Sequence, residues 1–206
     1  IINLLLFIAA HKVMMSQNVG IGTTTPSARL HVADSSVLFS ALGGAMSVAG
    51  NPPIQGVGRR VMWYADKAAF RAGYVNGTRW DKANTGNYSF ATGYNTMASG
   101  DYSTALGLGT QAVGDYSTAL GDATIASGSN STAMGRSTDA VGAYSTAMGF
   151  GTTAGGAYSS AIGNNTSAAG IYSTAMGKYT VATGYSSTAT GDSSLASGSV
   201  SFASGF

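Results

Sequence analysis

The sequence predicts an all-β protein: a parallel β-solenoid or β-roll of 14-residue coils, preceded by a small β-rich N-terminal cap. Three observations predict it. Every seventh residue from Gly86 to Gly205 is a glycine, 18 in all; Ala stands five residues after these glycines, from Ala91 to Ala203 without exception; and Ser and Thr alternate three residues after, as far as Thr180. A fixed period is typical of repeat architectures. Because two unlike heptads alternate, the repeat is 14 residues long, with eight full copies over 86–197 and a partial ninth.

A seven-residue period also occurs in coiled coils, but those need large apolar residues at two heptad positions. Here the repeated positions hold only small residues, and each interior glycine would cost a helix about 1 kcal/mol. Taken as a strand, residues 103–107 place Ser103, Ala105 and Gly107 on one face, and Thr104 and Leu106 on the other. The small-residue face suits a narrow interior. We therefore expect each heptad to give one short strand and one turn, which the glycine permits.

An apolar column predicts an interface between chains. In six successive coils, the residue six positions after the first glycine is large and apolar. These residues are Leu106, Leu120, Met134, Met148, Ile162 and Met176. Small residues already fill the coil interior, so this column faces outward, and a continuous exposed apolar stripe marks an interface. We expect a homotrimer that buries the column at its axis, with coverage by another segment of the same chain as the alternative. The number three does not follow from the periodicity.

A second column consists of tyrosines two residues after the first glycine of each coil. It begins at Tyr88, is interrupted at Asn130 and ends at Ser186. Tyrosine offers apolar area and a polar tip, which suits ligand binding. Stacked tyrosines also serve as a packing ladder, and both interpretations stay open. The candidate ligand-binding residues are Tyr102, Tyr116, Tyr144, Tyr158 and Tyr172.

The composition argues against an enzyme and against a cofactor. Only 9% of the 206 residues are charged, there is no Cys and no Glu, and the only histidines are His11 and His31. Acid–base catalysis at neutral pH usually draws on His, Glu or Cys. The absence of Cys also excludes disulfides and Cys-based zinc sites. We expect no catalytic residues, no metal and no cofactor.

Neither charge pattern in the chain predicts a charged ligand. Residues 1–85 contain eight Lys or Arg and three Asp, but the basic residues are scattered, whereas nucleic-acid surfaces cluster them. Asp101 and Asp115 stack once in the repeat, and the column continues with Ser129 and Ala143. A calcium ladder needs an Asp in every turn, so we expect neither a metal ladder nor a catalytic carboxylate pair.

The N-terminal segments predict a targeting signal followed by a cap. Residues 1–10 form an apolar run of about 15 Å as a helix, too short to span a membrane. This run is typical of a secretory signal peptide, here truncated and covering 1–17, with a buried first strand or helix as the alternative. Over 18–85 we expect a β-rich cap that seals the first coil, with a short strand at 28–32 and strand-like runs within 60–75.

The tyrosine-containing units carry a family resemblance. The runs YSTALG and YSTAMG recur within the pattern GxxSxAxGxxTxAx, at 102–107, 116–121, 144–149 and 172–177. This pattern, over 86–206, resembles the head repeat of YadA-like trimeric autotransporter adhesins. The resemblance implies a left-handed parallel β-roll, a trimer with the large apolar residues at its axis, display on a bacterial surface and adhesion to matrix proteins or other surfaces. Two upstream stretches, 18–32 and 58–82, resemble the leading segment of fibre proteins from Bacteroidetes-type bacteria.

The chain departs from the family pattern at the first outward position of the strand. Family members place an apolar residue there, whereas this chain has Thr104, Thr118, Thr132, Thr146 and Thr174. The expected trimer interface is therefore more polar than in the family.

The functional hypothesis is an extracellular or outer-membrane-surface adhesin head that binds a protein, glycan or other surface through many weak contacts. We expect no nucleic-acid partner and no membrane insertion by this segment. The alternatives are a structural spacer of a longer fibre and, less favoured, an ice-binding solenoid that uses the Thr column.

Overall fold

The computed structural model describes residues 19–34 and 36–205. The predicted signal peptide over 1–17 lies outside the described residues. The described residues form two compact units, one ending at Ser40 and the other beginning at Ala41, so the predicted cap over 18–85 has residues in both. In the first unit β1 (Val19–Ile21) pairs in parallel with β2 (Leu30–Val32). Among residues 19–34 and 36–205, no helix is long and apolar enough to cross a membrane.

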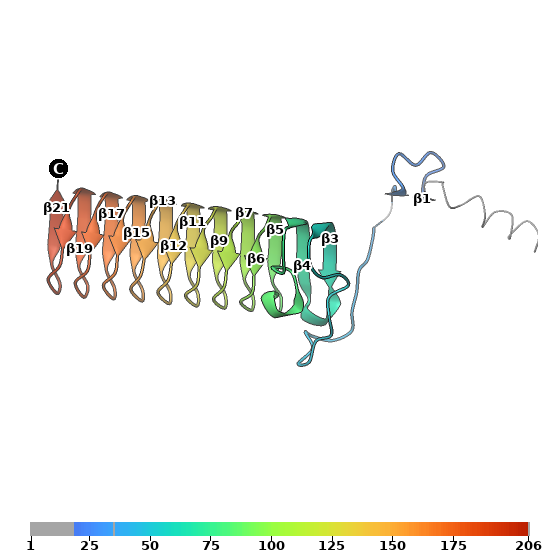
Figure 1. Cartoon of the computed structure of the whole chain (residues 1–206), viewed down its shortest axis with the longest axis horizontal. Coiled ribbons are helices and arrows are strands. Elements are labelled where there is room, and N and C mark those ends of the chain that lie inside the picture. Colours follow the sequence, from blue (N-terminus) through green and yellow to red (C-terminus); the bar gives the residue numbers. More distant parts are fainter. Residues whose placement is uncertain (1–18, 35, 206) are drawn as a thin grey trace, which may run out of the picture. The chain divides into compact units, whose positions relative to one another are not determined.

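The second unit is a parallel β-solenoid, as the glycine period predicts. Figure 1 shows its coils stacked in succession from β5 to β21. Each complete coil contributes one long and one short strand, and the strands form two sheets. The long strands are β5 (Phe90–Tyr94), β7 (Thr104–Leu108), β9 (Thr118–Asp122), β11 (Thr132–Arg136), β13 (Thr146–Phe150), β15 (Ser160–Asn164), β17 (Thr174–Lys178), β19 (Thr188–Asp192) and β21 (Phe202–Gly205). The short strands are β6 (Met97–Ala98), β8 (Gln111–Ala112), β10 (Ile125–Ala126), β12 (Asp139–Ala140), β14 (Thr153–Ala154), β16 (Ser167–Ala168), β18 (Val181–Ala182) and β20 (Leu195–Ala196).

The strand register confirms the 14-residue coil. Thr104 lies opposite Thr118 in the parallel sheet, and the same step of 14 residues continues along the solenoid. Hydrogen bonds join neighbouring coils, as where the Thr104 N–H donates to the Ser117 carbonyl at 2.9 Å. Identical positions of successive coils therefore form straight columns.

The core consists of small side chains, which explains why the repeat uses so few residue types. In each coil the Ala of the long strand and the Ala of the short strand are buried, as are the Ser and Thr that precede them. Ala105 and Ala112, for example, have no exposed surface. Thr104 and Leu106 lie on the outer face and stay partly exposed. The predicted division into an inner and an outer face is confirmed.

The repeated glycines have a second role besides the conformational one that the sequence suggests. A Cβ on Gly100 would lie 2.1 Å from the Gly114 carbonyl oxygen, and a Cβ on Gly107 would lie 2.0 Å from the Gly121 oxygen. The coils approach so closely there that no side chain fits. The left-handed residue of each turn is the one two positions after the glycine, such as Tyr102 with φ 57°. The expected conformational role of glycine holds for the second glycine of a coil, such as Gly107 with φ 123°, whereas the first, such as Gly100, has no positive φ.

The N-terminal end of the solenoid is closed by a hairpin of the same unit. β3 (Gly58–Tyr64) and β4 (Ala69–Val75) are antiparallel, and β4 pairs in parallel with β5. The 3₁₀ turn η2 (Ala65–Lys67) joins the two strands of the hairpin, and η3 (Lys82–Asn84) lies between β4 and the first repeat. The hairpin thus adds two strands to the long sheet.

Two large buried side chains of the cap replace the missing preceding coil. Arg71 occupies the column that holds Ala91 in the next strand, and its guanidinium donates to the carbonyls of Ser89 and Ala98, both at 3.0 Å. Burial lowers the pKa of Arg71 to about 10, so the guanidinium is charged at neutral pH. Trp80 is also fully buried, and its Nε1 donates to the Thr96 carbonyl at 2.9 Å.

Candidate ligand-binding surface

The predicted tyrosine column is a ladder of stacked rings. The ring centroids of Tyr102 and Tyr116 are 4.8 Å apart with an interplanar angle of 2°, and those of Tyr144 and Tyr158 are 4.8 Å apart with an angle of 1°. Tyr88 and Tyr172 extend the two stacks at 4.9 and 5.0 Å. The fold therefore brings all five candidate residues into one column, in two stacks separated by Asn130.

The tyrosines hold an unfavourable backbone conformation. Each has a φ between 54° and 58°, in the left-handed region. That region costs an ordinary L-residue about 1–2 kcal/mol, and Asn and Gly enter it most readily. The equivalent turn of the second heptad mostly uses such tolerant or small residues, as at Asn95, Gly109, Ser137 and Asn165. The tyrosine column thus places bulky rings at positions where the backbone conformation favours a small residue.

Stacking does not clearly outweigh this cost. A stacked aromatic pair contributes about 0.5–1.5 kcal/mol beyond its buried area, which is close to the cost of the left-handed backbone. About half of each side chain stays exposed, so the rings add little to the core. Strain that the fold does not need is a reason to look for a function at the residue concerned.

The surface of the ladder is neutral and aromatic. Burial raises the pKa of Tyr102, and the phenols of Tyr116 and Tyr88 and the Asp101 carboxylate raise it further. The Tyr102 hydroxyl is therefore protonated at neutral pH and can donate and accept hydrogen bonds. These groups can bind a ligand, but they include no activated nucleophile or base.

The two tyrosine stacks have different neighbours. Asp101 and Asp115 precede the rings of the first stack, whereas Ala143, Ala157 and Ile171 precede those of the second. The carboxylates are engaged with backbone: Asp115 Oδ1 accepts the Asp101 N–H at 2.9 Å, and Asp101 Oδ1 accepts the Asn87 N–H at 2.7 Å. Each carboxylate therefore holds the turn of the preceding coil.

One ring of this surface was not predicted. Tyr185 packs against Tyr172 with centroids 5.7 Å apart and an interplanar angle of 82°, so it covers the C-terminal end of the second stack edge-on. Tyr185 stands one position before the column, at which the sequence has Ser186. A search at the spacing of 14 residues therefore misses Tyr185. An aromatic residue one position away from the column, in the coil after Tyr172, is the signal that could have found it.

The predicted apolar column lies on the outer face of the long sheet. Leu106 pairs with Leu120, Leu120 with Met134, and the column continues in register to Met176. The side chains are half-buried by their own neighbours in the column, and Met176 is exposed. Thr104 and its equivalents form a parallel column beside it. This face is accessible in the single chain.

Two ion pairs lie at the end of the same long strands. Arg136 contacts Asp122 at 3.4 Å, and Lys178 contacts Asp192 at 3.6 Å. All four side chains are well exposed, so solvent screens each pair and neither adds much to stability. They balance charge between neighbouring coils and mark no site.

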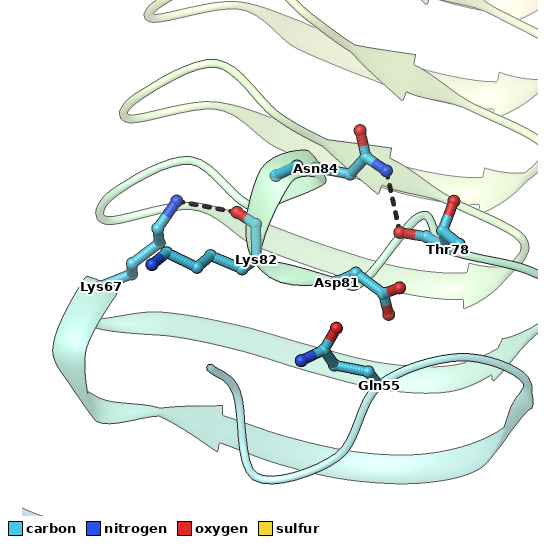
Figure 2. A pocket seen from close by; sticks show the side chains of 7 residues that line it. Gln55, Lys67, Thr78, Asp81, Lys82 and Asn84 are labelled. Carbon is cyan, nitrogen blue, oxygen red and sulfur yellow. Dashed lines mark hydrogen bonds between the residues drawn. The ribbon is translucent and has the colours of Figure 1, made fainter. Parts of the chain in front are cut away.

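The cap contains an open hollow of about 600 Å³. Figure 2 shows its polar lining, in which Lys67 reaches the Lys82 carbonyl and Asn84 reaches the Thr78 carbonyl. Asp81 Oδ1 accepts the Gly56 N–H at 2.7 Å. The lining residues are Gln55, Lys67, Thr78, Asp81, Lys82, Ala83 and Asn84. Most of these polar groups hold loops of the cap together.

No acidic or histidine cluster accompanies these surfaces. Within residues 19–34 and 36–205, no three His, Cys, Asp or Glu side chains lie close enough to hold a metal ion. His31 is in the first unit, where its Nδ1 lies 3.2 Å from the Ser27 nitrogen. The strongest candidate site is thus the tyrosine ladder.

Comparison with protein families agrees with this geometry. A family model described as the YadA head domain repeat matches overlapping segments that together span more than half of the chain. The segments are 85–110, 98–124, 112–138, 126–152, 140–166, 154–180 and 177–201. The matched family is an adhesin-type structural repeat rather than an enzyme family. Among curated proteins, no sequence matches the chain at a significant level.

Proposed function

Because the chain belongs to the YadA head-domain repeat family, we propose that it is the adhesive head segment of a fibre displayed on a bacterial surface. The tyrosine ladder binds an extracellular protein or glycan through many weak contacts. One observation carries this proposal: half-exposed tyrosines occupy a left-handed turn that favours smaller residues. Repetition along the solenoid then multiplies weak binding, and linked sites raise avidity by about 10²–10⁴.

The adhesion test replaces the ladder without changing the turn. Substituting Asn for the five residues Tyr102, Tyr116, Tyr144, Tyr158 and Tyr172 removes the rings and keeps a residue that suits the left-handed backbone. We expect binding to a panel of immobilised matrix proteins, glycans and abiotic surfaces to fall at least tenfold. The free energy of unfolding should change little per site, since lost stacking and relieved strain nearly cancel.

The matched control is Tyr179→Asn. Tyr179 holds the same left-handed conformation, with φ 53°, in the turn of the second heptad. We expect this variant to bind as the unchanged chain does. A folded five-site variant that binds the whole panel undiminished would refute the adhesive role of the ladder. Absence of binding by the unchanged, folded chain would favour the structural spacer.

We further propose that three chains assemble through the apolar column. The residues at this interface are Leu106, Leu120, Met134, Met148, Ile162 and Met176, with the Thr column at its edge. A stripe of this length on one face of a sheet is typical of an interaction surface. Trimers would also place three tyrosine ladders on one fibre and so raise avidity.

A charge placed in the middle of the column tests the assembly. We expect Met148→Lys to lower the mass measured by light scattering from three chains towards one, because the ammonium would be buried without a partner. Val141→Lys is the control, since Val141 is exposed beside the short sheet, outside the proposed interface. A mass of one chain for the unchanged protein would overturn the proposal.

A further inference from the structure

The tyrosine ladder is interrupted at one coil, and the interruption has a regular geometry. At the position of the missing ring stands Asn130, with φ 59°. Its N–H donates to the Asp115 carbonyl at 2.8 Å, and the Tyr144 N–H donates to the Ser129 carbonyl at 2.8 Å, as in the other coils. The backbone therefore keeps its spacing through the break, and only the ring is replaced.

The flanking rings face each other across this coil. Tyr116 and Tyr144 are two coils apart, so their ring planes are separated by about 9.6 Å, twice the ring spacing within the stacks. An Asn side chain is shorter than a phenol, so it fills only the inner part of this space. Tyr116 and Tyr144 are 57% and 53% exposed, the highest values among the stacked tyrosines.

The other ends of the two stacks have neighbours from outside the column. At the C-terminal end Tyr185 packs edge-on against Tyr172. At the N-terminal end Tyr88 is next to the cap, and its hydroxyl accepts the Ala45 N–H at 2.8 Å. The space over Asn130, here called the ring slot, is therefore the place along the ladder where two uncovered ring faces oppose each other.

We propose that the ring slot binds one neutral aromatic side chain, a phenol or an indole, of a protein partner. A ring at its centre would lie about 4.8 Å from each flanking ring, within the 4.5–7 Å range of stacked aromatic pairs and equal to the spacing of the ladder itself. The Asn130 amide can bond to its hydroxyl or N–H. The exposed Asp115 carboxylate next to Tyr116 disfavours an anionic ring. This inference builds on the proposed adhesive role and assigns it a partner chemistry.

The test titrates p-cresol, a tyrosine side-chain analogue, into the full-length chain and follows the cresol ring protons by NMR. We expect a saturable upfield shift at millimolar concentration, because a ring between two others lies in both ring currents. Asn130→Tyr fills the slot and should abolish the shift. Asn165→Tyr is the matched control, because Asn165 holds the same left-handed conformation in a second-heptad turn, and it should leave the shift unchanged.

A gain of binding completes the test. Tyr158→Asn places an Asn between Tyr144 and Tyr172 and should create a second slot, doubling the number of bound cresol molecules. No saturable shift, or the same shift in Asn130→Tyr, would overturn the inference. Methyl β-glucopyranoside serves as a sugar probe. The inference would also be overturned if this sugar, and not cresol, bound to the unchanged chain and lost its binding in Asn130→Tyr. Since Asn130→Tyr retains all five adhesive tyrosines, failure of the slot and failure of ladder adhesion are distinguishable.

Discussion

Gly135→Ala is expected to disrupt the solenoid at its middle. A Cβ at this position would lie 2.0 Å from the Gly149 carbonyl oxygen, which is backbone and has no room to move. The φ of Gly135 is 120°, a conformation that L-residues with a side chain rarely adopt. Overpacking and backbone strain add, so we expect the free energy of unfolding to fall by at least about 4 kcal/mol.

The measurement is urea unfolding followed by far-UV circular dichroism on the full-length chain. Repeat proteins gain stability from neighbouring interfaces, so breaking one interface should lower the midpoint or split the transition in two. Gly109→Ala is the control: Gly109 has φ 65°, a Cβ there would meet nothing within 4 Å, and Ala123 holds the same turn one coil later with φ 52°. We expect this control to lose only about 1 kcal/mol. Equal midpoints for the two variants would contradict the close-approach explanation.

The contrast between these two glycines shows what the sequence could predict. Periodicity reports which positions repeat, so it correctly predicted the 14-residue coil, the small core and the stacking of Tyr102 on Tyr116. It does not report why a position repeats. A glycine required only by its φ, such as Gly109, and a glycine required also by a neighbouring carbonyl, such as Gly135, look alike in a sequence, and nothing in the sequence marks the tyrosine two residues after Gly100 as the left-handed residue of its turn.

The ring slot was visible in the sequence only as an irregularity. Asn130 interrupts the tyrosine column, which by itself suggests a weakened ladder. Its meaning depends on coil spacing that stays regular through the break and on rings that stack face to face, and neither can be deduced from residue types. The candidate residues were thus predictable, whereas the place where they leave two ring faces free was not.

The cap could not be predicted in detail because its decisive residues occur once. Arg71 counted only as part of a scattered basic surplus, and Trp80 had no partner in any pattern. Arg71 and Trp80 have their roles because the first coil has no earlier coil to bond to its carbonyls. In later coils the Thr carbonyl of the short-strand column accepts a backbone N–H, as Thr110 does from Met97 at 2.9 Å. Thr96 is the first residue of this column, so no earlier coil supplies a backbone N–H to its carbonyl. The Trp80 indole N–H donates to it instead.

Trp80 is therefore expected to matter more for stability than any other single side chain of the cap. Trp80→Ala removes a fully buried indole and should lower the free energy of unfolding by about 3–5 kcal/mol. Trp80→Phe retains most of the buried area but leaves the Thr96 carbonyl without its donor, which should cost about 1–3 kcal/mol. Urea unfolding measures both, and hydrogen exchange of the Met97 and Gln111 amides should show the first coils opening before the later ones.

Trp63→Phe provides the matched control for the hydrogen bond. The Trp63 Nε1 is buried and has no hydrogen-bond partner among the described residues, so its removal leaves no carbonyl unpaired. We expect Trp63→Phe to cost less than about 1 kcal/mol. If Trp80→Phe were no more destabilising than Trp63→Phe, the bond to Thr96 would not be what closes the solenoid. Protection of the first coils would then depend on indole packing and on the buried Arg71 guanidinium, which donates to the Ala98 carbonyl.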